Sequence, residues 1–122
     1  MLGEEQYQAY RNRIEELRCF GELDGISVNQ ASEKDFWSFF GATPFVLTAE
    51  TVLLDNGNLR VIRDDEDGNH VRLQFLGNGR LHYVIFRRRK RSSHVSRVAG
   101  RDTFNGVRRR LRLFELEPLL QA

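Results

Sequence analysis

The chain has 122 residues and a mass of 14.3 kDa, which suits one domain with a core of its own, here residues 1–122, and is too little for two. Its 40% apolar and 30% charged residues, with a net charge of +2, exclude a disordered chain, and no apolar run approaches the roughly 18 residues of a membrane-spanning helix. The N-terminus lacks a signal-peptide pattern and Cys19 is the single cysteine, so we expect a cytoplasmic protein without disulfides.

A helix is the first predicted element, over residues 4–20, because apolar residues recur at spacings of three and four and acids occupy the first turn. Gly21 is expected to cap its C-terminus. The apolar stripe consists of Tyr7, Tyr10, Ile14 and Leu17.

An aromatic block at residues 36–40 follows, and it predicts a short second helix. Ser32 and Asp35 stand at capping-box spacing before it, and Gly41 is expected to end it. Such a block is typical of core. The alternative is an exposed docking surface, because two helical turns cannot bury four large rings on one side.

Beyond Thr43-Pro44 the pattern changes to the period of two that is typical of strands. Asn56-Gly57 predicts a two-residue hairpin loop, Gly77–Gly79 predicts a three-residue loop, and a further turn lies in residues 64–69. The first loop pairs Leu54 with Leu59 and Val52 with Val61; the last pairs Phe75 with Leu81, Leu73 with Tyr83 and Val71 with Ile85.

One apolar face across all four strands results if Val61 pairs with Val71 and Leu59 with Leu73. Leu59, Leu73, Phe75, Tyr83 and Ile85 are then expected to be buried, with Arg60, Arg72 and His82 on the other side. The same register places Arg60 beside Arg72, an arrangement of like charges that favours an anion or an acidic partner over this face. Ile62, Gln74, His82, Val84 and Phe86 share it, a mixture typical of a binding surface.

A fifth strand over residues 95–99, ended by Gly100, and a final helix complete the predicted fold. Asp102 or Thr103 is expected to cap that helix. The fold class is α+β: a four- to five-stranded antiparallel meander with an N-terminal and a C-terminal helix packed on one face, plus the short aromatic helix. The last helix carries an apolar stripe of Phe104, Val107, Leu111 and Phe114, and arginines at 108, 109, 110 and 112.

No set of residues indicates catalysis. The three histidines have no predictable partners, and Cys19 is expected to be an inert thiol. The acidic run at residues 64–69 fails the spacing of a calcium loop, because Gly68 at the sixth position puts Arg63 first and Gln74 twelfth. We therefore expect no enzyme activity, no cofactor and no metal site.

Charge is segregated along the chain more strongly than the net value shows. Residues 1–59 hold four bases against ten acids, residues 60–122 hold fifteen against seven, and residues 80–112 hold twelve against Asp102 alone. An anionic partner would explain this pattern. Arginine-rich composition and a solvated surface are the plain alternative, since seventeen of the nineteen bases are Arg.

A basic hairpin tip at residues 87–91 follows the fourth strand, where five like charges repel one another and a phosphate backbone would relieve the repulsion. Such a run also resembles a nuclear-localisation signal. The anion-binding residues predicted from the sequence are Arg87, Arg88, Arg89, Lys90, Arg91, Arg60, Arg72, Arg108, Arg109 and Arg112.

Two functions remain open at this point. The first is a non-enzymatic nucleic-acid-binding protein that contacts phosphates through the hairpin and the last helix. Against it, the net charge is modest and the sheet lacks the aromatic pattern of a base-stacking surface. The second is a protein-interaction module, either a homodimer or the partner of an acidic protein in a small bacterial operon, which the opposed charges of the two halves would allow.

Overall fold

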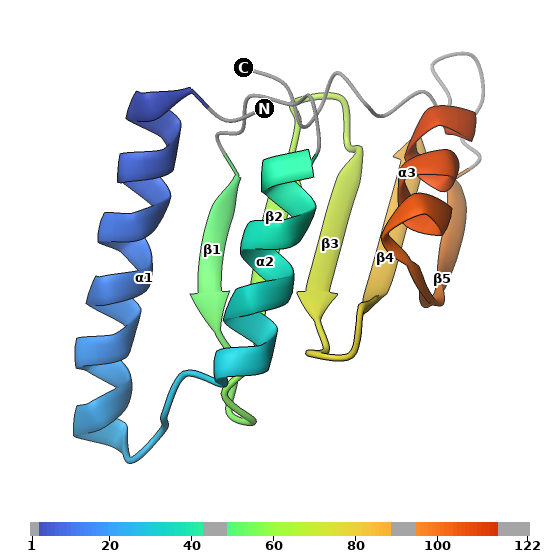
Figure 1. The fold of residues 1–122 in the computed structure, drawn as a ribbon. Helices are drawn as coiled ribbons and strands as arrows, with labels where there is room; N and C mark the ends of the chain where they lie inside the picture. The colour runs from blue at the N-terminus through green and yellow to red at the C-terminus, as the bar shows by residue number, and fades with distance from the viewer. Residues whose placement is uncertain (1–2, 43–48, 89–94, 115–122) are drawn as a thin grey trace.

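Figure 1 shows a five-stranded antiparallel sheet with helices on one of its faces. The computed structural model describes residues 3–42, 49–88 and 95–114. The elements are α1 (Glu4–Asp24), α2 (Gln30–Ala42), β1 (Glu50–Leu53), β2 (Leu59–Asp64), β3 (His70–Phe75), β4 (Arg80–Arg88), β5 (Val95–Thr103) and α3 (Phe104–Leu113).

The strands are ordered β1-β2-β3-β4-β5, so each one is hydrogen-bonded to its neighbour in sequence. Helix α1 packs along β1, α2 lies over β2 and β3, and α3 lies over β4 and β5 (Figure 1). The predicted α+β class, with the N-terminal, aromatic and C-terminal helices on a meander, is therefore confirmed.

The core lies between the helices and the inner face of the sheet. Alternate residues of β3 and β4 are buried, as the period of two predicts. Phe36, Phe39 and Phe40 of α2 are 0% exposed and meet Phe75 of β3 at ring-centroid distances of 5.5 to 5.8 Å. The aromatic block is thus core and not a docking surface. The sheet residues predicted to be buried are so: Leu59, Leu73, Phe75, Tyr83 and Ile85.

The β3–β4 register is the predicted one, residue by residue. Phe75 lies opposite Leu81, and Leu73 lies opposite Tyr83. Gly77 and Gly79 adopt φ of +88° and +79°, and their backbone N–H groups both donate to a carboxylate oxygen of Asp35, at 3.0 and 2.9 Å. The predicted capping residue of α2 therefore holds the β3–β4 turn instead.

The predicted β1–β2 register is wrong by one residue. Leu53 lies opposite Leu59 and Thr51 opposite Val61, because the loop has three residues and the Leu54 N–H donates to the Asn58 carbonyl at 2.9 Å. Gly57 ends this loop with a φ of +86°. A Cβ there would lie 2.5 Å from the Ser27 carbonyl oxygen, so the site requires glycine. Thr51 therefore faces the core in place of Val52.

The predicted β2–β3 pairing is also displaced, by two residues, so Val61 lies opposite Leu73. A shift of two keeps every side chain on its face, which is why the burial prediction is right while the neighbours are wrong. Arg60 lies opposite Gln74, and Arg72 lies opposite Ile62. The predicted Arg60–Arg72 juxtaposition is therefore corrected: the two are diagonal neighbours.

Both N-terminal helices exceed their predicted bounds. Helix α1 continues through Gly21, which is buried, and ends at Gly25, whose φ of 73° provides the left-handed C-cap. Asn29 precedes α2 and accepts from the Ala31 N–H at 3.0 Å, so Ser32 does not cap it. The Ser32 hydroxyl instead donates to the Phe75 carbonyl at 2.6 Å and accepts from the Leu59 N–H at 2.9 Å.

At the C-terminal end, β5 runs on to Thr103, past the predicted stop at Gly100. Thr103 then caps α3, and its hydroxyl accepts from the Gly106 N–H at 3.2 Å. This confirms one of the two predicted caps. The extra strand residues place further side chains on the face of the sheet that the helices leave uncovered.

Candidate functional site

The outer face of the sheet, opposite the helices, is the candidate site. No described helix covers it, and its side chains are half-buried or exposed. Strand alternation and the register assign each charged side chain of the described strands to this face or to the inner one. The bases on the outer face are Arg60, Arg72, Arg80, Arg88, Arg97, Arg101, His70 and His82, and its acids are Glu50 and Asp64.

Register aligns these residues in rows that cross the strands. One row runs from Arg60 through Gln74 and His82 to Arg101. Since neighbouring strands are about 4.8 Å apart, Arg60 and Arg101 begin about 14 Å from each other across the sheet. Arg60 and Arg101 form no ion pair with any described carboxylate, so the row presents two positive ends on either side of polar residues.

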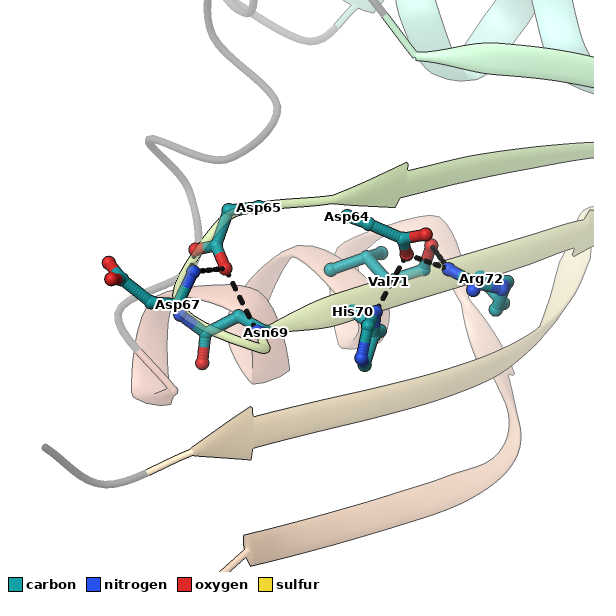
Figure 2. A network of polar contacts seen from close by, with 7 residues as sticks. All are labelled: Asp64, Asp65, Asp67, Asn69, His70, Val71 and Arg72. Atoms are coloured by element: carbon teal, nitrogen blue, oxygen red, sulfur yellow. Dashed lines mark hydrogen bonds and ion pairs between the residues drawn. The ribbon is translucent and has the colours of Figure 1, made fainter.

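A second row contains Asp64, His70, Phe86 and Arg97. Figure 2 shows Asp64 beside both His70 and Arg72. Asp64 Oδ1 accepts from Arg72 Nη1 and lies 2.8 Å from His70 Nδ1. The hydrogen bond from Arg72, reinforced by His70, holds the pKa of the Asp64 carboxyl below its usual value. Asp64 is therefore ionised at neutral pH and offsets part of the charge of Arg72.

Phe86 is the aromatic residue among the described residues of the outer face. It is partly exposed, and the Arg97 guanidinium lies over it, 5.5 Å from the ring centroid. His70 meets the same ring edge to face, with centroids 5.9 Å apart. Ile62 and Val84 lie on either side of Arg72 in the adjacent row, so apolar side chains lie among the bases of this face.

In the acidic turn between β2 and β3, the Asp65 carboxylate is hydrogen-bonded to other groups of the same turn (Figure 2). Asp65 accepts from the backbone N–H groups of Asp67 and Asn69 and from the Asn69 side chain, at 2.8 to 2.9 Å. Burial opposes ionisation here, but these hydrogen bonds lower the pKa of the Asp65 carboxyl. Within the described ranges, no three His, Cys, Asp or Glu side chains gather as a metal site.

The two described residues of the predicted basic hairpin, Arg87 and Arg88, lie on opposite faces of the sheet at the end of β4. Arg88 is exposed on the outer face, where its side chain passes over Gly68. Arg87 points to the inner side, and its guanidinium donates to the Phe114 carbonyl at the end of α3. The other predicted hairpin residues, Arg89, Lys90 and Arg91, lie outside the described residues.

Helix α3, with its arginines, lies over the covered face of the sheet (Figure 1), whereas the register places Arg60 and Arg72 on the opposite face. Arg108 donates to the Phe39 carbonyl at 3.3 Å, and its guanidinium lies 5.0 Å from the Phe39 ring centroid. Burial lowers the pKa of Arg108. Arg109 and Arg112 are exposed. The residues predicted as one anion site therefore form two surfaces, separated by the sheet, and Arg108 packs against the core.

Two site residues, Arg97 and Arg101, were not predicted from the sequence. Both are exposed on β5, with Ala99 between them on the same face. A strand predicted to stop at Ala99 excludes Arg101. Two features of the sequence indicate a longer strand. Arg97, Ala99 and Arg101 alternate with the period of a strand, and the helix cap at Thr103 sets the position at which the strand must end.

His82 lies opposite Gln74 on the outer face, as predicted, and the Cys19 thiol is free and exposed on α1. A hollow of about 500 Å³ lies between α1 and β1, where Tyr10 and Thr51 form part of its wall. Burial raises the pKa of Tyr10 to about 12. The residues that line this hollow include no histidine or cysteine.

Comparison with known proteins gave no relative: no family model, no curated protein and no solved structure matches the chain. None of the helices in the described ranges is both long and apolar enough to cross a membrane.

Proposed function

We propose that this chain is a non-enzymatic binding protein that engages an anionic partner, and that the partner is nucleic acid. The observation that carries the proposal is the outer face of the sheet, where four neighbouring strands bring arginines together and no described helix covers them. These arginines are Arg60 of β2, Arg72 of β3, Arg80 and Arg88 of β4, and Arg97 and Arg101 of β5.

Electrostatics favour a polyanion over a single charged group. Within the described residues, Arg72 is the one outer-face arginine in an ion pair, and Arg60, Arg80, Arg97 and Arg101 have none. Like charges spread over one face repel one another. A phosphate backbone would relieve that repulsion at several positions at once, and release of its counterions would supply the affinity.

The test compares two pairs of arginines on opposite sides of the sheet. Binding of labelled 12-nucleotide single strands and a 12-base-pair duplex is measured by fluorescence anisotropy over a range of salt. Arg60→Gln with Arg101→Gln should weaken binding and make the slope of log affinity against log salt shallower by about two, one for each lost phosphate contact. Arg109→Gln with Arg112→Gln, an equal loss of charge on α3, should change the slope less. Absence of binding near physiological salt would reject the proposal.

A protein-interaction module is the second candidate, and one observation favours it. Phe20 and Leu23 on α1 are 59% and 85% exposed, near the acidic residues Glu22 and Asp24. An acidic, partly apolar helix could contact the basic outer face of another copy, head to tail. Light scattering at low salt distinguishes the two candidates: a monomer that gains mass only with nucleic acid supports the first, whereas concentration-dependent growth without it supports the second.

A further inference from the structure

Phe86, Val84 and Ile62 place apolar side chains among the bases of the outer face, and charge alone does not account for them. We infer that the outer face binds single-stranded nucleic acid, with Phe86 as the platform on which one base stacks and with the surrounding arginines on phosphates. This inference rests on the proposed function and names the form of nucleic acid that the face accepts.

Phe86 occupies the position that such a platform needs. It lies on β4 and has a neighbour on each side in its row, His70 of β3 and Arg97 of β5. The ring is on the side of the sheet away from the core, since the adjacent residue Ile85 is 0% exposed on the inner face. A partly exposed ring among basic side chains loses more contact with water when a base covers it than when a phosphate approaches its edge.

The ring already carries a planar partner. The Arg97 guanidinium lies 5.5 Å from the centroid of the Phe86 ring. Guanidinium groups and nucleobases both stack on aromatic faces. Arg97 therefore occupies a position over this ring, and a base that stacks there would displace its guanidinium toward the phosphate of the same nucleotide.

The broad sheet face and its exposed ring favour a single strand over a duplex. Arg60 and Arg101 lie in one row, about 14 Å apart across three strand spacings, with polar residues between them. A duplex is read by a helix or a two-stranded ribbon that enters a groove, and its base faces are hidden in the stack. A broad sheet face presents no such element, and against a duplex Phe86 and Val84 would meet only sugar and phosphate. A single strand offers base faces and phosphates together.

The experiment uses the whole chain, with fluorescein-labelled T12 DNA, U12 RNA and a 12-base-pair DNA duplex. Phe86→Leu keeps an apolar side chain but removes the ring, and it should weaken binding of the single strands by about 5- to 100-fold. The salt slope should not change, because no phosphate contact is lost. Duplex binding should be weaker than single-strand binding in the parent protein and unaffected by the variant. The DNA and RNA arms show which of the two sources the face prefers.

Matched variants separate stacking from other effects. Phe86→Tyr retains the ring and should bind as the parent does. If Phe86→Leu fails to fold by circular dichroism, Phe86→Met replaces it as the variant without a ring, and single strands that bind equally to Phe86→Tyr and Phe86→Met would count against stacking. Ile62→Leu alters an apolar side chain of the same face two strands away from the ring, and it should change the affinity far less than Phe86→Leu does. A strand with 2-aminopurine should lose fluorescence on binding to the parent and not to Phe86→Leu.

The results distinguish the inference from the function on which it rests. If Arg60→Gln with Arg101→Gln weakens binding while Phe86→Leu does not, or if the duplex binds more tightly than the single strands, the stacking platform is rejected and nucleic-acid binding stands. If none of the three nucleic acids binds, both proposals fail.

Discussion

The inner and outer faces of the sheet are built from alternate residues of the same strands, yet they differ in solvent exposure and in charge. Along β4, Leu81, Tyr83 and Ile85 are at most 3% exposed. His82 and Phe86, between and beyond them, are only partly covered. The period of two thus assigns stability to one face and leaves the other available for a partner. Substitutions on the two faces should therefore separate folding from binding.

The largest effect is expected at the centre of the inner face. Leu73→Ala should lower the free energy of unfolding by about 2 to 5 kcal/mol, because it leaves a cavity at a residue that is 0% exposed. His82→Ala, on the outer face of the adjacent strand, should change it by less than about 0.5 kcal/mol. Urea denaturation followed by circular dichroism measures both. A loss below about 1 kcal/mol for Leu73→Ala would contradict the assignment of this face as core.

A smaller loss is expected where α2 joins the sheet. The Ser32 hydroxyl bonds the Phe75 carbonyl and the Leu59 N–H, at 2.6 and 2.9 Å, and it is buried. Ser32→Ala leaves both backbone groups without that partner and should cost about 1 to 3 kcal/mol. Ser38→Ala, at an exposed position of the same helix, should have no such cost. Equal effects in thermal denaturation would mean that the Ser32 bonds add nothing.

The sequence predicted which face of the sheet each side chain occupies better than it predicted which residues pair between strands, and the reason is geometric. The pairing across Gly77–Gly79 was predicted correctly, because the hydrophobic alternation on both strands and the loop length agree. Asn56-Gly57 is compatible with a two-residue or a three-residue loop. The choice is made by a distant contact, since Gly57 packs against Ser27 and its carbonyl accepts from the Asn29 N–H at 2.8 Å. Local sequence does not contain that information.

The sequence predicted some residues of the candidate site and not others, because it shows where charge occurs along the chain but not where side chains lie in space. A run of basic residues shows that charge is present, but not which side of a strand or helix faces a partner. Arg87 and Arg88 are adjacent and lie on opposite faces. Arg108, which was predicted as an anion ligand, packs on Phe39 of the core. The candidate site on the outer face depends on the pairing of β5 with β4, which places Arg97 beside Phe86 and Arg101 beside His82.

The corrected β1–β2 register makes a prediction of opposite sign. Thr51 is 1% exposed and faces the core, and its hydroxyl has no hydrogen-bond partner among the described residues. Thr51→Val removes a buried polar group that lacks a partner and keeps the side-chain shape, so the free energy of unfolding should rise by about 1 kcal/mol. Thr51→Ser keeps the hydroxyl and loses a methyl, and it should be less stable than the parent. A valine variant less stable than the parent in urea would show that this hydroxyl is bonded.

The smallest effect on stability is expected at Asp64, where the outer face carries its own negative charge. Asp64 pairs with Arg72 and His70, and all three side chains are exposed enough for water to screen them. Asp64→Asn should therefore change the free energy of unfolding at pH 7 by less than about 0.5 kcal/mol. Because Arg72 first and His70 second lower the pKa of this carboxyl below its usual 3.8, the stability from its ionisation is present above that pH and is lost as the pH falls through the lowered pKa. The parent and the asparagine variant should then differ by a constant amount above about pH 5 and converge below it.

The affinity of Asp64→Asn for nucleic acid should increase, because one negative charge leaves the outer face and Arg72 loses its ion pair and can contact phosphate. Single-strand affinity at low salt should rise by about 2- to 5-fold. Asp67→Asn, in the adjacent turn, removes an equal charge that no arginine of the outer face contacts in the described structure, and a rise as large as that of Asp64→Asn would mean that net charge, and not the arrangement on this face, sets the affinity.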